Sequence, residues 1–135
     1  MLDLLSAIQT HWDGDPALVS GLGGLWHGRA PAGTAMPYAV MVSVVADSPE
    51  YTSGRPYVDI SRVQFSVFAS DDAAAMGYVE TIKTRFDEER LTIAGPDKYC
   101  IEMRRIGGGV LPDGDNEVVA WHAFVEYRVS VGKSL

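Results

Sequence analysis

The sequence contains a single cysteine, Cys100, so the chain cannot form an internal disulfide. Disulfides persist mainly in oxidising compartments, and a reducing compartment therefore fits this chain best. Cys100 lies in the alternating run Tyr99-Cys100-Ile101, and no histidine is close to it in sequence to act as a base. This pattern indicates a small, partly buried apolar side chain and not a nucleophile.

Long hydrophobic runs and targeting segments are also missing. The longest apolar stretch, residues 38–46, is far shorter than the roughly 20 residues that a membrane-spanning helix needs. The N-terminus carries Asp3 where a secretory signal would carry basic residues, and Gln9 and His11 interrupt its apolar run. We therefore expect a soluble, cytosolic product that does not enter a membrane.

Basic residues are few, with 11 Lys and Arg against 18 Asp and Glu, which gives a net charge of −7. Their only adjacent pair, Arg104-Arg105, falls on alternate faces of a predicted strand. This balance argues against free affinity for nucleic acid, although the protein can stand beside DNA without binding it. A length of 135 residues with 47% hydrophobic residues predicts one globular domain over residues 1–135.

No catalytic, metal-binding or cofactor-binding motif is present in the sequence. The three histidines show no metal-ligand spacing, and no serine lies in a Gly-x-Ser-x-Gly turn. Residues 113–117 begin like a calcium loop, but the positions that require Gly and Glu hold Val118 and Phe124. Gly107-Gly108-Gly109 lacks the following Lys and helix of a phosphate loop. We expect no enzyme, metal or cofactor, and carboxylates that meet only in the fold are the catalytic alternative left open.

The hydrophobic periodicity predicts an α+β fold, a mostly antiparallel sheet with two helices packed on one face and long hairpin loops. One helix is expected over residues 2–12, and a further turn capped by Asp15 follows it. The second helix is expected from a cap at Ser70 or Asp71 to about residue 89. Its predicted core face consists of Ala75, Val79, Ile82 and Phe86. Strands are expected over residues 25–27, 37–45, 58–69, 91–94, 99–106 and 117–131, of which the last is the longest.

Two predicted loops, residues 47–57 and 107–116, are longer than most hairpin connections. Long loops of compact domains often contact partners. The candidate contact residues in and beside these loops are Asp47, Glu50, Tyr51, Arg55, Tyr57, Asp113, Asp115 and Glu117.

Three segments carry a resemblance to a known family, and they are Asp15-Pro16-Ala17-Leu18-Val19, Leu25-Trp26-His27-Gly28-Arg29-Ala30-Pro31 and Met36-Pro37-Tyr38-Ala39-Val40. With them the chain resembles the phage tail-completion family, also called tail-to-head joining proteins, which is related in fold to tail terminators. The strand over residues 63–68, the Ala-rich helix start at 73–75 and the final strand over 121–131 are similar too. The resemblance covers nearly the whole chain.

The resemblance implies a structural virion protein of the tail and neck, made in the host cytoplasm. It implies a ring of six copies that caps the tail tube, with the tail-tube protein and a head-neck connector protein as partners. DNA would pass through the lumen without specific binding, and Asp113, Asp115 and Glu117 are candidates for lumen-facing or tube-facing charge. The alternatives are a head-side neck adaptor and a small α+β ligand-binding or carboxylate-based hydrolytic domain.

Overall fold

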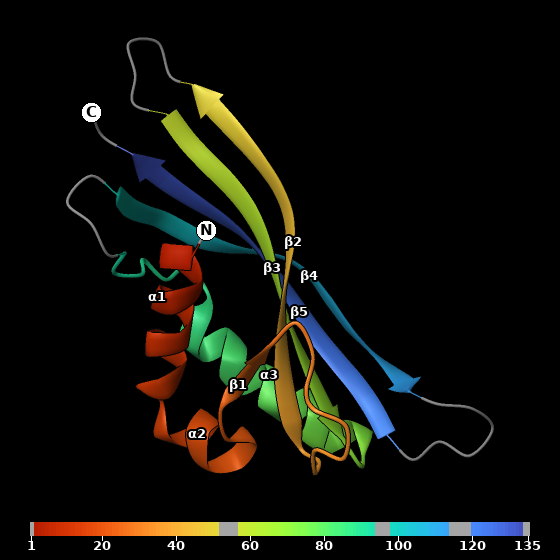
Figure 1. Cartoon of the computed structure of the whole chain (residues 1–135). Coiled ribbons are helices and arrows are strands. Elements are labelled where there is room, and N and C mark those ends of the chain that lie inside the picture. Colours follow the sequence, from red (N-terminus) through yellow and green to blue (C-terminus); the bar gives the residue numbers. More distant parts are fainter. Residues whose placement is uncertain (1, 52–56, 94–97, 114–119, 134–135) are drawn as a thin grey trace.

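The computed structural model describes residues 2–51, 57–93, 98–113 and 120–133, and it combines three helices with a five-stranded sheet (Figure 1). The order of the strands in the sheet is β1-β2-β3-β5-β4, in which β1 runs parallel to β2 and the other neighbours are antiparallel. The predicted α+β class with a mostly antiparallel sheet is confirmed. In chain order the elements are α1 (Leu2–Asp13), α2 (Pro16–Leu22), β1 (Leu25–His27), β2 (Tyr38–Tyr51), β3 (Tyr57–Ala69), α3 (Asp72–Phe86), β4 (Lys98–Asp113) and β5 (Ala120–Lys133).

Helices α2 and α3 begin at the predicted caps, Asp15 and Asp71. The Asp15 carboxylate accepts hydrogen bonds from the backbone N–H groups of Ala17 and Leu18, and Asp71 accepts one from Ala74. The segment after Asp15 is a full short helix, so the sheet has three helices beside it and not two. All four residues of the predicted α3 core face are buried. No helix among the described residues is both long and apolar enough to span a membrane.

The prediction that α3 continues to about residue 89 is wrong. Its last turn closes where the Asp87 N–H bonds to the Lys83 carbonyl, and Glu88 then takes a φ of 60°, which breaks the helix. Residues 88 and 89 pair with the edge of β4. The Glu88 N–H donates to the Met103 carbonyl, and the Met103 N–H donates to the Glu89 carbonyl.

The described residues of the predicted loop over 47–57, which are 47–51 and 57, belong to strands. β2 continues to Tyr51 and β3 begins at Tyr57, and these two residues are register partners. Ser48 and Pro49 suggested a turn, but a shift in register between Val44 and Ser48 accommodates them. A proline is tolerated here because, within the described part of the chain, this half of β2 has a neighbouring strand on one side only.

The predicted loop over residues 107–116 is also strand as far as Asp113. Gly107, Gly108 and Gly109 pair with Glu126, Val125 and Phe124 of β5, after a register shift between Arg105 and Gly107. Backbone hydrogen bonds alone sustain this pairing, so the side-chain pattern gives no signal for it. β4 has 16 residues and β5 has 14, so β5 is not the longer strand within the described residues.

The predicted strand over residues 91–94 is not found in its described part, residues 91–93. Leu91 and Ile93 are buried beside the polar, exposed Thr92, which produced the alternating pattern. Burial of a non-strand segment in the core therefore explains the apolar residues. Residue 94 and the turn expected at 95–97 lie outside the described residues, as do residues 117–119 of the predicted final strand.

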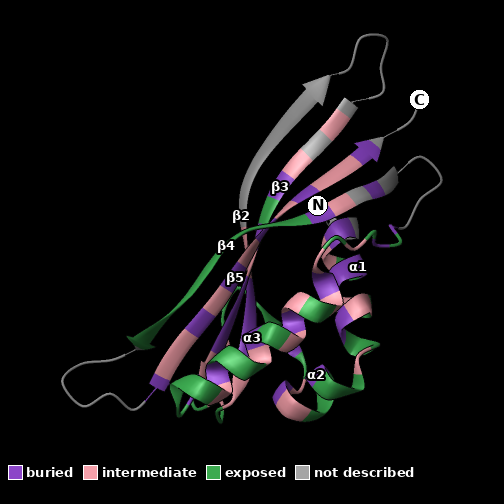
Figure 2. Cartoon of the chain, turned by 180° about the vertical axis from the view of Figure 1, so that it is seen from behind, coloured by how far each residue is buried: buried purple, intermediate pink, exposed green. Residues whose placement is uncertain are grey.

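The core lies between the helices and one face of the sheet. Phe65 of β3 is at its centre, with ring centroids 4.8 Å from Phe86, 5.9 Å from Tyr127 and 6.1 Å from Trp12. Buried residues lie on the strands where the helices cover them, whereas the later half of β4 is exposed (Figure 2). The sheet face away from the helices is called the open face below.

Candidate assembly surfaces

The three histidines contact protein groups on different elements. His11 Nε2 lies 2.9 Å from the Arg85 carbonyl oxygen, and His27 Nε2 lies 2.8 Å from Gln9 Oε1. His122 stacks on Phe68 with ring centroids 4.6 Å apart. Within the described residues, no three or more His, Cys, Asp or Glu side chains are grouped so that they could hold a metal ion.

Tyr127 of β5 is fully buried in the core, and its phenol is hydrogen-bonded there. Its hydroxyl donates to Asp87 Oδ1 at 2.6 Å, and Arg105 Nη2 lies 3.5 Å from the other carboxylate oxygen. Burial, and then the hydrogen bond to Asp87, raises the pKa of Tyr127 above its ordinary value. The phenol is therefore protonated at neutral pH and fastens the end of α3 to the sheet.

Cys100 is buried, as the alternating sequence pattern predicts. Burial raises the pKa of its thiol, so the reactive thiolate is disfavoured at neutral pH. The position of Cys100 is therefore that of a core residue.

The structure separates the candidate contact residues into two groups. Asp47 lies within the register shift of β2, whereas Glu50, Tyr51 and Tyr57 belong to the paired ends of β2 and β3. The register places Tyr57 opposite Lys133 at the end of β5. Asp113 pairs with Ala120 at the start of β5, roughly 40 Å away along that strand. The two groups therefore lie at opposite ends of the sheet. Arg55, Asp115 and Glu117 lie outside the described residues.

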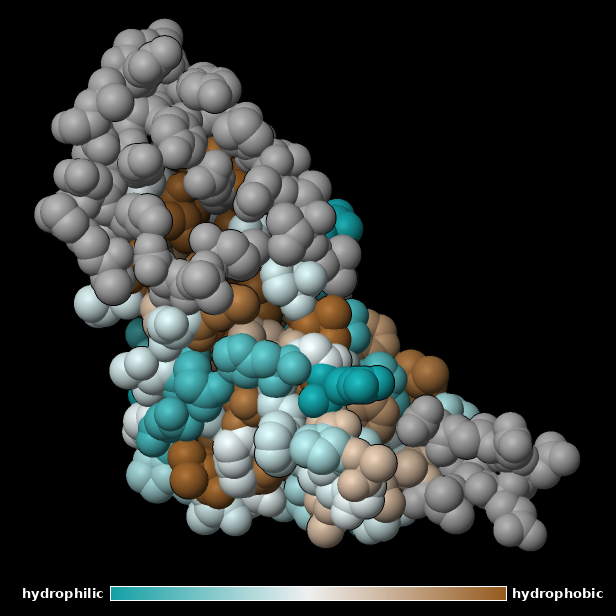
Figure 3. Space-filling model, in the orientation of Figure 1, coloured by the Kyte–Doolittle hydropathy of each residue, from teal (hydrophilic) through white to brown (hydrophobic). Residues whose placement is uncertain are grey.

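Exposed large hydrophobic side chains occur on or beside both edge strands of the sheet, β1 and β4, and we name the two sets by these strands. The first, the β1-side patch, consists of Val19 on α2, Trp26 on β1 and Met36 before β2. In Figure 3 hydrophobic side chains reach the surface in the region of α2. The second, the β4-side patch, consists of Met76 on α3 and of Ile106, Val110 and Leu111 on β4. Met76 and Val110 line one shallow hollow of about 130 Å³, so α3 and β4 contribute to the same surface.

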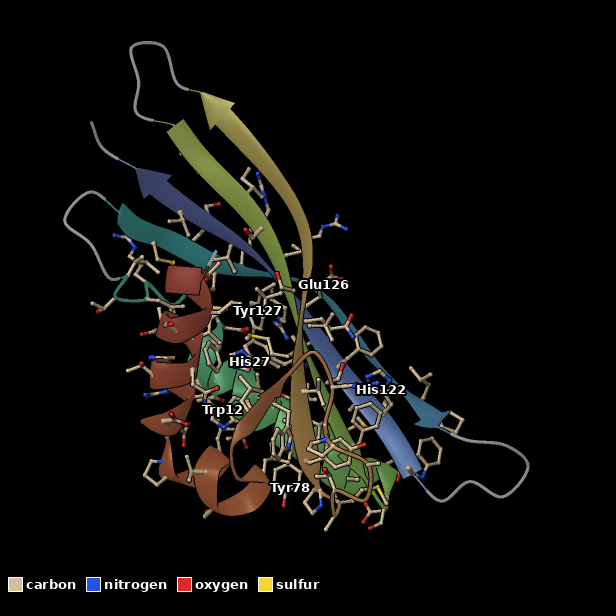
Figure 4. The ribbon with its side chains drawn as sticks, viewed as in Figure 1. Trp12, His27, Tyr78, His122, Glu126 and Tyr127 are labelled. Atoms are coloured by element: carbon tan, nitrogen blue, oxygen red, sulfur yellow. The ribbon has the colours of Figure 1, made fainter. Side chains whose placement is uncertain are left out.

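The open face carries a row of three arginines that the sequence analysis did not find. Arg62 of β3 and Arg104 of β4 are both direct register partners of Arg128, which lies on the strand between theirs. Direct partners point to the same face of a sheet. Figure 4 shows Tyr127 on the side of the helices and its neighbour Glu126 directed away from them, as alternation requires. Strand alternation places each arginine on a face, but only the register between strands brings them into one row.

Next to this row the open face is aromatic. Tyr38 stacks on Phe68 at 5.1 Å, Phe68 on His122 at 4.6 Å, and Phe124 lies 5.6 Å from His122. The loop after β1 contributes Gly28, Arg29 and Ala30 to a hollow of about 320 Å³ over these rings. Aromatic and arginine side chains are the residue types enriched in protein interfaces, so this face too has the composition of a contact surface.

Comparison with known proteins gives a family match over nearly the whole chain. Residues 6–132 match the family described as Tail completion protein gp17. The chain belongs to this family. It is therefore a structural protein of a phage-type tail, as the sequence resemblance predicts. No match is found among the curated proteins.

A solved structure described as the virion of a native gene transfer agent particle contains a chain of the same fold. The TM-score is 0.76, with 11% sequence identity over 96% of this chain and 94% of that one. At this identity the similarity establishes the fold. The fold of this chain, with its long strands, therefore also occurs in a chain of that virion particle.

Proposed function

We propose that the chain forms a ring of six copies at the head-proximal end of a long phage tail. In this position it completes the tail tube and joins it to the capsid neck, as one tail-completion domain over residues 1–135. The observation that carries the proposal is the family match, which extends over residues 6–132. The similar fold in a virion particle supports the same setting.

The ring would contact a tail-tube protein on one side and a head-neck connector protein on the other. The ends of the sheet are suited to these contacts because they lie far apart and project beyond the helices (Figure 1). We assign Asp47, Glu50, Tyr51, Arg55 and Tyr57 to one contact, and Asp113, Asp115 and Glu117 to the other. An acidic chain also suits a lumen through which DNA passes, because negative charge repels phosphate.

The proposed role is structural and involves no reaction. One hollow, about 410 Å³ in volume, is lined by three carboxylates, Asp87, Glu88 and Glu102, together with Arg104 and Arg105. Asp87 already binds Tyr127 and Arg105, so it holds the fold together at this corner. This geometry favours a structural function over a carboxylate-based hydrolase.

Electron microscopy with labelled protein tests the function directly. The chain is mixed with tail tubes and, separately, with DNA-filled heads from particles that lack it. We expect label at one end of each tube, in rings about as wide as the tube, and restored joining of heads to tails. Label at the head vertex with bare tube ends would assign the chain to a head-side adaptor instead. Normal particles formed without the chain would contradict both positions.

A further inference from the structure

We propose that neighbouring copies in the ring join edge to edge, with the β4-side patch of one copy against the β1-side patch of the next. This inference rests on the proposed ring and names the two surfaces that close it. The occupant of each patch is a second copy of this chain.

Part of the outer edge of β4 has no paired strand among the described residues. Residues 88 and 89 cover it at Met103, but within the described chain no segment pairs with the outer side of residues 107–111. A register shift after Arg105 precedes this stretch, and Pro112 follows it. Such features discourage pairing with another strand at the positions they occupy, and residues 107–111 lie between them. Ile106 and Leu111 are 43% and 44% exposed on it, and Met76 of α3 is 50% exposed beside it. An exposed, apolar edge strand of this kind is suited to pairing with another strand.

The opposite edge is short and aromatic. β1 has three residues, which pair with Ala39, Val40 and Met41 of β2, and no described strand lies on its other side. Trp26 projects from it and is 42% exposed. Tryptophan contributes more binding energy in protein interfaces than most residues because it buries a large, rigid surface. Val19 and Met36, which come before and after β1 in the chain, are 41% and 40% exposed.

Charge is depleted in the two chain segments that form the sheet edges. Residues 106–112 contain no Asp, Glu, Lys or Arg, and Arg29 is the only such residue between positions 16 and 46, in a chain with 21% charged residues. Interface cores are depleted in charge in the same way. The hollow between Met76 and Val110 is also lined by Glu80 and Lys83, and these two side chains form an ion pair with each other at 2.8 Å. Two copies can therefore meet along these edges with the charges of this hollow already paired.

The arrangement of the two patches selects the head-to-tail mode. They differ in sequence and lie on opposite edges of one sheet, so each copy offers one surface of each kind. Contact between unlike surfaces repeats from copy to copy and closes into a ring when the rotation fits. A partner that covered one patch alone would leave the other exposed to water.

Two single-edge variants test this mode, each with a glutamate on one edge. Trp26→Glu blocks the β1 edge and Val110→Glu blocks the β4 edge, and both positions are exposed, so the fold should persist. We expect neither variant to form rings or cap tubes alone. An equimolar mixture restores one good interface, and it should give a species of twice the monomer mass and none larger. The double variant Trp26→Glu/Val110→Glu should form no complex with either single variant.

Cysteine cross-linking on tail tubes covers the case in which rings need the tube to assemble. A chain that carries both Trp26→Cys and Leu111→Cys should form a ladder of covalent multimers under mild oxidation. The native Cys100 is buried and should not take part in these cross-links. Thr84→Cys with Leu111→Cys is the matched control, since Thr84 is exposed on α3, and it should stay monomeric. Rings that form normally from both glutamate variants, without cross-links at 26 and 111, would overturn the edge contact and leave the ring intact. Failure of the wild-type chain to form rings or cap tubes would instead remove the proposed function.

Discussion

Arg104 on β4 and Arg128 on β5 are direct register partners, and Arg62 on β3 is the register partner of Arg128 on its other side. Like charges directly opposite each other destabilise a sheet, by an amount of roughly 0.2–1 kcal/mol per pair. Arg62 is partly compensated by Glu126, whose carboxylate lies 3.9 Å from its Nε. Strand pairing on the open face therefore places Arg128 between two side chains of the same charge.

Removing the exposed end of this row should stabilise the protein. We expect Arg104→Thr to raise the free energy of unfolding by about 0.5 kcal/mol at low salt, because it removes a cross-strand repulsion and adds a strand-favouring residue. The gain should shrink at 1 M salt, where charges are screened within about 3 Å. Urea denaturation at both salt concentrations measures the difference. Arg90→Thr, at an exposed position outside the sheet, is the control, and a loss of stability in Arg104→Thr at low salt would refute the repulsion.

The hydroxyl of Tyr127 should matter for stability. Tyr127→Phe keeps the ring against Phe65 but removes the 2.6 Å hydrogen bond to Asp87. Because the acceptor is a carboxylate, we expect a loss of about 1–2 kcal/mol in the free energy of unfolding. Chemical denaturation at pH 7 measures it, and an unchanged midpoint would show that water replaces the hydroxyl without loss.

The raised pKa of Tyr127 gives this variant a second test at alkaline pH. In the unfolded chain a tyrosine loses its proton at a pH of about 10, whereas the folded protein keeps the Tyr127 proton above that pH. Stability should therefore fall as pH rises above about 10, by up to about 1.4 kcal/mol per pH unit from this group. Tyr127→Phe should lack that part of the slope. Equal slopes for the two proteins between pH 9 and 11 would contradict the assigned burial.

Two tryptophans should differ in their contribution to stability. Trp12 is fully buried, stacks on Phe65 and donates from Nε1 to the Gly23 carbonyl at 3.1 Å, whereas Trp26 is exposed. We expect Trp12→Phe to cost about 1–3 kcal/mol through a cavity and a lost hydrogen bond. Trp26→Phe should change the monomer by less than about 0.5 kcal/mol. Thermal unfolding of both variants at low protein concentration measures this, and similar losses would place Trp26 in the core.

The elements that the sequence predicts well are those with a strong local signal. The core face of α3 repeats at helical spacing, and Asp15 and Asp71 cap helices through contacts within three residues. Such signals depend on the chain nearby and not on the rest of the fold. The contact between Tyr127 and Asp87 joins residues 40 positions apart, and no local pattern announces it.

The candidate surfaces are harder to predict because exposure depends on what the fold covers. A tryptophan in a short strand, such as Trp26, is expected in the core from the sequence alone. It is exposed because β1 lies at the edge of the sheet. The arginine row has the same character, since the register of three strands creates it. The candidate contacts at residues 47–57 and 113–117 stay predictions.

The three consecutive glycines of β4 provide a test of the strand that the sequence pattern hides. A Cβ on Gly108 would lie 2.8 Å from the backbone oxygen of Phe124 in β5, whereas a Cβ on Gly107 would meet nothing within 4 Å. Gly108→Ala must therefore push β4 and β5 apart, and we expect a loss of about 1–3 kcal/mol. Gly107→Ala should be neutral or stabilise by about 0.5 kcal/mol, because alanine restricts the unfolded chain. Thermal unfolding of the two variants decides between strand and loop, because residues 107–109 in a loop would tolerate both alanines equally.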